Sequence, residues 1–222
     1  MTRAEYAEEI KRIEEQNNVE LEIYPMAVDI IGPTLKNWSK RYVFARKRTA
    51  RGQIYYGLSS FPDVAILDRS FRNMPNEEIS AEDWEKLKGC LEVKSLGKKL
   101  ITKEEIETVL NEKTQTLISD EMGQLLGEVL WYKKVIYTNG IEWRFLHVDE
   151  YKDELRKSMI NTVNERIKAE NTPSSEEFIW WKHLRESDVK IADFKIRDEC
   201  ITKNCLSNWD NFIAEINSID WA

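Results

Sequence analysis

Two short apolar segments constrain the fold of this chain more than any other feature of its sequence. Residues 61–67 read FPDVAIL and residues 89–96 read GCLEVKSL, with Gly97 ending the second segment. Short aliphatic runs bounded by Gly or Pro are typical of buried β-strands. Helical patterns lie before and after them in the sequence, so we expect an α/β fold with a central mixed sheet flanked by helices.

The rest of the chain predicts further elements on both sides of these strands. Capping signals, charge and apolar spacing predict helices over residues 3–17, 81–88, 102–111 and 118–132. Strands are expected over 19–31, 42–45, 53–58, 134–138 and 141–148, and Asn139-Gly140 predicts a hairpin turn between the last two. Helices over 151–170, 175–185 and 208–219 follow. We therefore predict a core domain over residues 1–150 and a C-terminal helical extension, residues 151–222, packed on it.

The sequence carries no signal for a membrane. No run approaches the roughly 20 apolar residues needed to cross a bilayer. Residues 1–16 are dominated by charged side chains and lack the apolar centre of a signal peptide. The three cysteines, Cys90, Cys200 and Cys205, fit a reducing compartment. We expect a cytoplasmic protein with no membrane partner.

Charge is distributed unevenly along the chain. The net charge is −7, which by itself argues against a nucleic-acid partner. However, no acidic residue lies between Asp29 and Asp63. Two interpretations stay open for this stretch: a surface that binds phosphates, or a solvated loop that is basic by chance. For the first, the candidate nucleic-acid contacts are Lys40, Arg41, Arg46, Lys47, Arg48 and Arg51.

Three charged residues within the two apolar segments indicate a catalytic, metal-binding site. Asp63 opens the first strand, and Glu92 and Lys94 are two apart on the second, so their side chains point to one face. Two paired strands would bring both carboxylates around one hard cation such as Mg²⁺. An adjacent ammonium could orient water or stabilise developing negative charge. The alternative is a structural Glu92–Lys94 pair, or charges at strand edges.

The same segments resemble a known family. FPDVAILD, CLEVKSLGKKL and QLLGEVLWYKKVIYTNGIEWRF are similar to the PD-(D/E)xK, or restriction-endonuclease-like, nuclease superfamily. The resemblance covers residues 61–145 and is most like the nuclease domain of type I restriction enzyme motor subunits. It implies a restriction-endonuclease-like core and Mg²⁺- or Mn²⁺-dependent hydrolysis of phosphodiester bonds. Asp63, Glu92 and the Val93 carbonyl would be metal ligands, and Lys94 a catalytic lysine.

The chain departs from that family at two places. Many relatives have a tyrosine four residues after the helix glutamine, here Gln124, and this chain has Glu128 instead. We treat Gln124 and Glu128 as accessory candidates, with Glu128 either contacting the metal or facing solvent. Relatives often add a carboxylate from the first helix, but the sequence does not select one among Glu5, Glu8, Glu9, Glu14 and Glu15.

Three functions are compatible with these observations. The first is an Mg²⁺-dependent endonuclease acting on DNA, in restriction, repair or defence against mobile elements, and able to pair as a homodimer. The second is a nuclease-fold module that binds DNA or protein with weak or no cleavage. The third is an α/β protein unrelated to nucleic acid, which the acidic net charge favours.

Overall fold

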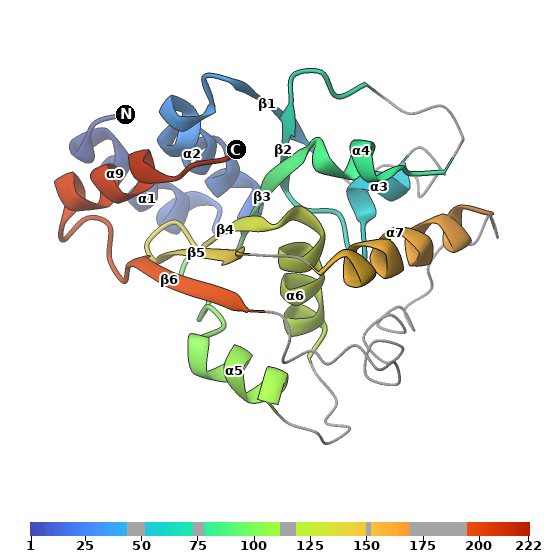
Figure 1. The fold of residues 1–222 in the computed structure, drawn as a ribbon. Helices are drawn as coiled ribbons and strands as arrows, with labels where there is room; N and C mark the ends of the chain where they lie inside the picture. Colours follow the sequence, from blue (N-terminus) through green and yellow to red (C-terminus); the bar gives the residue numbers. More distant parts are fainter. Residues whose placement is uncertain (44–51, 73–77, 112–118, 150–151, 169–194) are drawn as a thin grey trace.

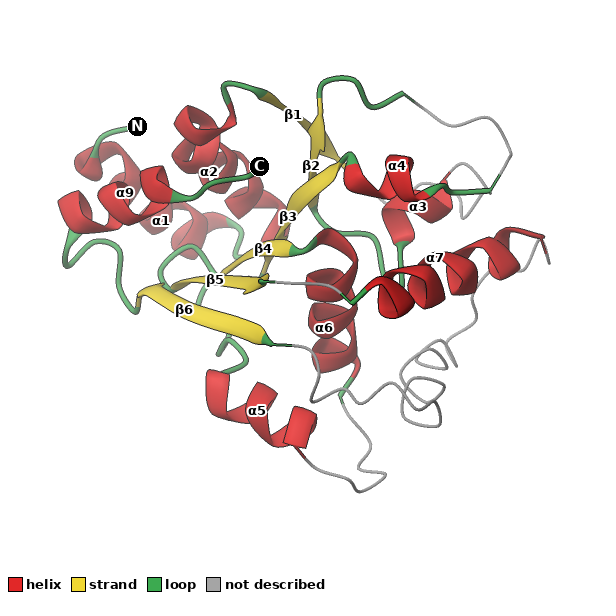
Figure 2. Ribbon diagram, viewed as in Figure 1, coloured by secondary structure: helices red, strands yellow, loops and turns green. Residues whose placement is uncertain are grey.

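A six-stranded mixed sheet is the centre of the computed structural model, which describes residues 1–43, 52–72, 78–111, 119–149, 152–168 and 195–222. The strand order in space follows the order in sequence (Figure 2). All neighbouring strands are antiparallel except β3 and β4, which are parallel. The strands are β1 (Trp38–Tyr42), β2 (Val64–Asp68), β3 (Leu87–Val93), β4 (Lys134–Thr138), β5 (Trp143–Val148) and β6 (Ile196–Thr202).

The two faces of the sheet are both buried, each in its own hydrophobic cluster. On β2, Ala65 and Leu67 belong to one cluster, and Val64 and Ile66 belong to the other. A strand covered on both faces needs apolar residues at every position, not at alternate ones. This is why the segment reads as a continuous apolar run, and the expected α/β class with helices flanking a sheet is confirmed.

One face is covered by α1 (Arg3–Gln16), α2 (Glu20–Ile31) and α9 (Trp209–Ser218), grouped on one side of the sheet in Figure 1. Helix α1 starts with a capping box in which Thr2 and Glu5 bond each other's backbone N–H groups. Seven of the twelve residues of helix α2 are buried, and Pro25 lies inside it on the exposed face. The short 3₁₀ helix η1 (Gly32–Leu35) then leads into β1.

The opposite face is covered by α6 (Asp120–Tyr132) and α7 (Asp153–Lys168), with the short helices α3 (Gln53–Tyr56) and α4 (Ala81–Glu85) beside them. Helix α5 (Lys103–Asn111) precedes α6 in the connection from β3 to β4. Parallel neighbours need such a crossover because a tight turn cannot join them. Trp131 of α6 anchors the layer by donating to the Ile54 carbonyl oxygen at 2.7 Å.

Three predicted elements differ from the structure. Residues 19–31 were expected to form a strand, but they contain α2, in which buried apolar residues outnumber the polar ones and leave only a narrow polar face. Residues 53–58 were also expected to be a strand, but they form α3, which ends at Gly57. The C-terminal extension is not purely helical, because β6 joins the sheet beside β5.

Other predicted elements agree with the structure within a few residues. The helices over 3–17, 102–111, 118–132 and 208–219 and the 134–148 hairpin are confirmed as α1, α5, α6, α9 and β4–β5. The strand expected over 42–45 lies earlier, as β1, and residues 44–45 are outside the described part. The helix expected over 175–185 also lies outside it. No helix in the described part is both long and apolar enough to span a bilayer.

Candidate active site

Asp63, Glu92 and Lys94 lie together at one end of the β2–β3 pair. The strands pair with Val64 opposite Leu91, so the next position places Asp63 opposite Glu92. The Asp63 N–H donates to the Leu91 carbonyl oxygen at 3.2 Å, which continues the ladder to this position. Opposed residues of an antiparallel pair have Cβ atoms about 4.5–5.5 Å apart and share a face. The two carboxylates therefore face the same space, on the α6 side of the sheet.

The Asp63 carboxylate is held by two donors from different elements. Tyr24 of α2 donates its hydroxyl to Oδ1, and the backbone N–H of Val93 donates to Oδ2 at 2.6 Å. Burial raises the pKa of Asp63 to about 6, although these two hydrogen bonds and the nearby Lys94 ammonium oppose the rise. The carboxylate thus has a fixed orientation before any ligand arrives.

Glu92 and Lys94 form a buried ion pair beside it. The Lys94 ammonium donates to Glu92 Oε1, and the Gln124 amide donates to the same oxygen at 2.8 Å. Burial raises the pKa of Glu92 well above its usual value, and repulsion from Glu128 and Asp63 adds to this. Burial alone would lower the pKa of Lys94, but the Glu92 carboxylate outweighs it and keeps the amine charged.

Glu128 belongs to the same group of charges. It projects from α6 with 1% of its surface exposed, so the expectation that it could face solvent is wrong. Ser60 donates its hydroxyl to Glu128 Oε1 at 2.8 Å, and the Gln124 amide lies 3.3 Å from the same oxygen. Burial raises the pKa of Glu128 to about 8 against these hydrogen bonds.

Two carboxylate oxygens at this site are buried and have no hydrogen-bond partner among the described residues. They are Oε2 of Glu92 and Oε2 of Glu128, and the second oxygen of each group is already bonded. A buried polar atom left unpaired costs about 1–3 kcal/mol. Three carboxyl groups also face a single ammonium, so the site has an excess of acid. Both features fit a site made for a cation.

The donor set fits a hard divalent cation best. Asp63 and Glu92 supply carboxylate oxygens, and Val93, the next residue after Glu92, supplies a backbone carbonyl. Mg²⁺ is commonly held by one or two carboxylates and retains several waters. Across the described ranges, no group of three or more His, Cys, Asp or Glu side chains has the arrangement of a metal cluster. A cation here would therefore depend on two carboxylates, a carbonyl and water.

A fourth carboxylate near the site comes from a residue that the sequence did not indicate. Glu20, in the first turn of α2, raises the pKa of both Asp63 and Lys94 by its charge. The glutamates considered on the first helix are not among the main influences on these pKa values. Because residues 19–31 were read as a strand, neither Glu20 nor Tyr24 was considered as part of the site.

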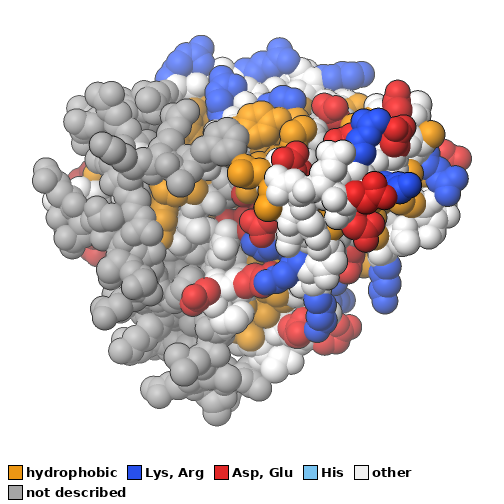
Figure 3. Space-filling view, turned by 180° about the vertical axis from the view of Figure 1, so that it is seen from behind, with side chains coloured by type: hydrophobic (Ala, Val, Ile, Leu, Met, Phe, Trp, Pro, Cys, Tyr) orange, Lys and Arg blue, Asp and Glu red, His pale blue; other side chains and the backbone are white. Residues whose placement is uncertain are grey.

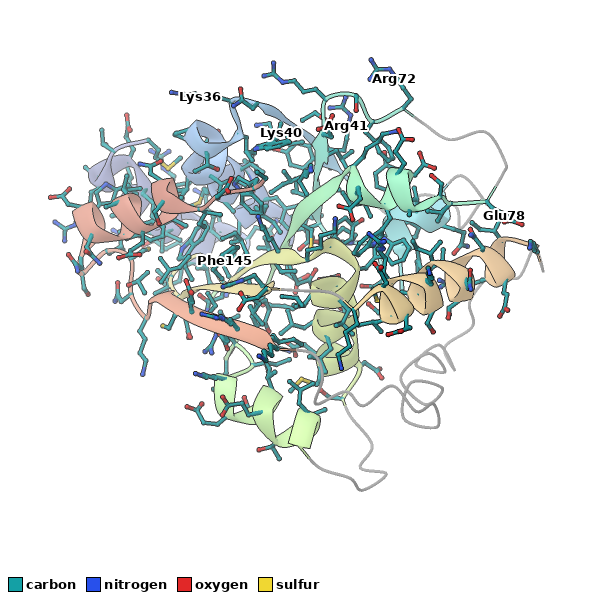
Figure 4. The ribbon with its side chains drawn as sticks, viewed as in Figure 1. Lys36, Lys40, Arg41, Arg72, Glu78 and Phe145 are labelled. Carbon is teal, nitrogen blue, oxygen red and sulfur yellow. The ribbon has the colours of Figure 1, made fainter. Side chains whose placement is uncertain are left out.

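Two of the six predicted nucleic-acid contacts lie on the neighbouring edge strand. Lys40 and Arg41 are exposed on β1, opposite Ile66 and Ala65 of β2. Figure 4 shows them with Lys36 and Arg72 along one edge of the molecule. The remaining members of that set are outside the described residues: Arg46, Lys47, Arg48 and Arg51.

Comparisons with known proteins add no family or relative to this description. No family model, no curated protein and no solved structure matches the chain. The chemistry of the site is therefore the basis for assigning a function.

Proposed function

We propose that this chain is a metal-dependent nuclease that hydrolyses phosphodiester bonds of DNA. The observation that supports this most strongly is the pair of unpartnered buried oxygens, on Glu92 and Glu128, beside the Lys94 ammonium. Acids and an amine buried this deeply cost several kcal/mol unless something compensates them. A bound divalent cation and an anionic substrate would provide that compensation.

A bound Mg²⁺ or Mn²⁺ would neutralise charge on the phosphate and lower the pKa of an attacking water. The chain's own residues prepare the place for it. Tyr24 and the Val93 N–H fix the Asp63 carboxylate, and Gln124 fixes Glu92. Lys94 stays protonated through its contact with Glu92, so its ammonium can stabilise negative charge on an attacked phosphate.

The architecture supports a restriction-endonuclease-like core. Three consecutive strands, β1 to β3, are antiparallel, with Asp63 directly before β2 and Glu92 on β3, and a crossover containing α5 and α6 leads to the parallel strand β4. Helix α6 supplies Gln124 and Glu128 to the site, as expected for a crossing helix of that core. The TNG turn follows β4, as the resemblance implies.

Cleavage of plasmid and single-stranded DNA with Mg²⁺ or Mn²⁺ tests the proposal. Wild-type protein should cut, and EDTA should abolish cutting. Lys94→Ala and Asp63→Asn should each lower the cleavage rate by at least about 100-fold, because each removes electrostatic stabilisation of the transition state. Lys99→Ala is the matched control, since this lysine is 76% exposed in its ion pair with Glu105, and it should cut at the wild-type rate.

Two outcomes would contradict the proposal. Full activity in Lys94→Ala would mean that a contaminant or another site does the cutting. DNA binding without metal-dependent cutting in the wild-type protein would favour the second function, a nuclease-fold binding module. Circular dichroism of each variant separates lost chemistry from lost folding.

A further inference from the structure

A groove of about 340 Å³ lies on the same face of the sheet as the candidate active site, at the outer edge of β1. Ser39 and Arg41 of β1 form one wall, and Tyr55 and the Phe71–Arg72 pair form the other. Ser39 and Arg41 of β1 lie opposite Leu67 and Ala65 of β2, whose side chains are on the α6 side of the sheet. The side chains of Ser39 and Arg41 are therefore on that side as well. Tyr42, which packs against the opposite hydrophobic cluster, also lines the groove, so the groove lies around the outer edge of β1.

The cations around this groove lack acidic partners within the described ranges. Arg41 donates to the Lys40 carbonyl at 2.8 Å, and Arg72 donates to the carbonyls of Arg69 and Phe71 at 2.8 and 3.1 Å. About half of the other lysines and arginines of the described part are paired with carboxylates, as Lys133 is with Glu85. Lys and Arg side chains also gather along this edge when it is seen from behind (Figure 3). Their charge is available to an anion.

Aromatic rings line the same groove. Tyr55 and Phe71 contact each other edge to face, with ring centroids 5.7 Å apart. A ring pair between two arginines offers flat apolar surface next to positive charge. This combination suits a base and its phosphate, and it is how many proteins bind single strands without reading sequence.

The groove also leads toward the candidate active site. Val43, at its near end, donates its N–H to the Asp63 carbonyl at 3.1 Å. At about 3.4 Å per strand residue, Leu67, which also lines the groove, lies about 14 Å from Asp63. About four nucleotides at the 3.4 Å spacing of a stacked strand would cover that length, and fewer would cover it in an extended strand. One phosphate of a nucleic-acid strand lying in the groove would thus reach the carboxylates of Asp63 and Glu92.

We propose that this groove binds an extended single strand of nucleic acid and guides it to the Asp63–Glu92 site. Arg41 and Arg72 bind consecutive phosphates, and Tyr55 and Phe71 stack against a base. The inference rests on the proposed nuclease function, and it adds that the substrate is single-stranded. Binding itself needs no metal, so it can be measured when cleavage is blocked.

The test is fluorescence anisotropy with a labelled oligothymidylate of about 12 nucleotides, in EDTA, over a range of salt concentrations. Arg41→Ala/Arg72→Ala should weaken binding at least about tenfold and reduce the logarithmic salt slope by about 1.4, the value for two single-strand phosphate contacts. Arg3→Ala is the matched control, because this arginine also donates to a backbone carbonyl, that of Leu206, and lies on α1. It should bind as wild type does.

An abasic oligonucleotide of equal length tests the stacking. It keeps the phosphates but has no bases, so it should bind at least about tenfold more weakly than oligothymidylate. Equal binding of both oligonucleotides, competition by polyglutamate at equal charge, or an unchanged salt slope in the double variant would each overturn the inference. If the wild-type protein cuts DNA but the double variant binds the oligonucleotide as wild type does, the groove proposal fails and the nuclease function stands. If the groove binds the oligonucleotide but the protein does not cut DNA, the nuclease function fails and the groove proposal stands.

Discussion

Glu128 shows how strongly burial controls the charge of this site. Its side chain is almost fully enclosed, and its pKa of about 8 means that the metal-free protein keeps a proton there at neutral pH. The unfolded chain would release that proton near pH 4.5, the usual value for glutamate. Folding without a cation therefore retains a proton that a cation would displace.

Stability of the metal-free protein should consequently fall as pH rises. Between pH 4.5 and 8 the folded state binds more protons at Glu128 than the unfolded state, so the free energy of unfolding decreases through that window. Glu128→Gln removes the titration, so its melting temperature in EDTA should fall less between pH 5 and pH 8 than that of wild type. Each kcal/mol corresponds to about 2–4 °C in a chain of this size.

Differential scanning calorimetry at several pH values measures this difference. Glu8→Gln, at an exposed carboxyl on α1, is the control and should follow the wild-type pH dependence. If Glu128→Gln also followed the wild-type curve, Glu128 would not hold a proton in the folded protein at neutral pH.

At the scale of elements, the connection around α3 is positioned by Gly57. This residue has φ of +57°, and a Cβ there would collide with the Trp131 indole. The turn matters for the site because the chain after it carries Ser60, which donates to Glu128, and then Asp63. The close approach of the backbone to Trp131 thus sets where the loop enters β2.

Gly57→Ala should destabilise the protein by about 2 kcal/mol or more, since it combines backbone strain with overpacking. Gly32→Ala is the matched control. Gly32 has helical backbone angles and nothing within 4 Å of a Cβ, so alanine should be neutral or slightly stabilising there. Urea unfolding compares the two, and equal midpoints would contradict this account of the turn.

Elements with a clear hydrophobic periodicity or a clear turn signal could be predicted from the sequence, and the others could not. The stripe of Tyr6, Ile10 and Ile13 identifies α1, and Asn139-Gly140 identifies the β4–β5 turn. Helix α2 could not be predicted because seven of its twelve residues are buried and Pro25, a residue that usually breaks helices, lies within it. Strand β6 was missed because none of its residues is buried at this sheet edge, which leaves no apolar run.

For the whole molecule, the site is assembled from parts far apart in the chain. Asp63, Glu92 and Lys94 could be predicted because two adjacent apolar strands carry them. Tyr24 and Ser60 could not, since their contacts depend on how α2 and the α3–β2 connection pack on the sheet. The group thus depends on the helices of both layers as well as on the strands.

The central claim is that this assembly holds one divalent cation between Asp63 and Glu92. Titration of Mn²⁺ followed by electron paramagnetic resonance tests it directly, without requiring activity. Wild type and the control Lys99→Ala should bind one Mn²⁺ with equal affinity. Glu92→Gln should bind at least about 100-fold more weakly, because losing even a supporting residue of a metal site costs 10–100-fold. Mn²⁺ binding of equal affinity in Glu92→Gln and wild type would contradict the claim.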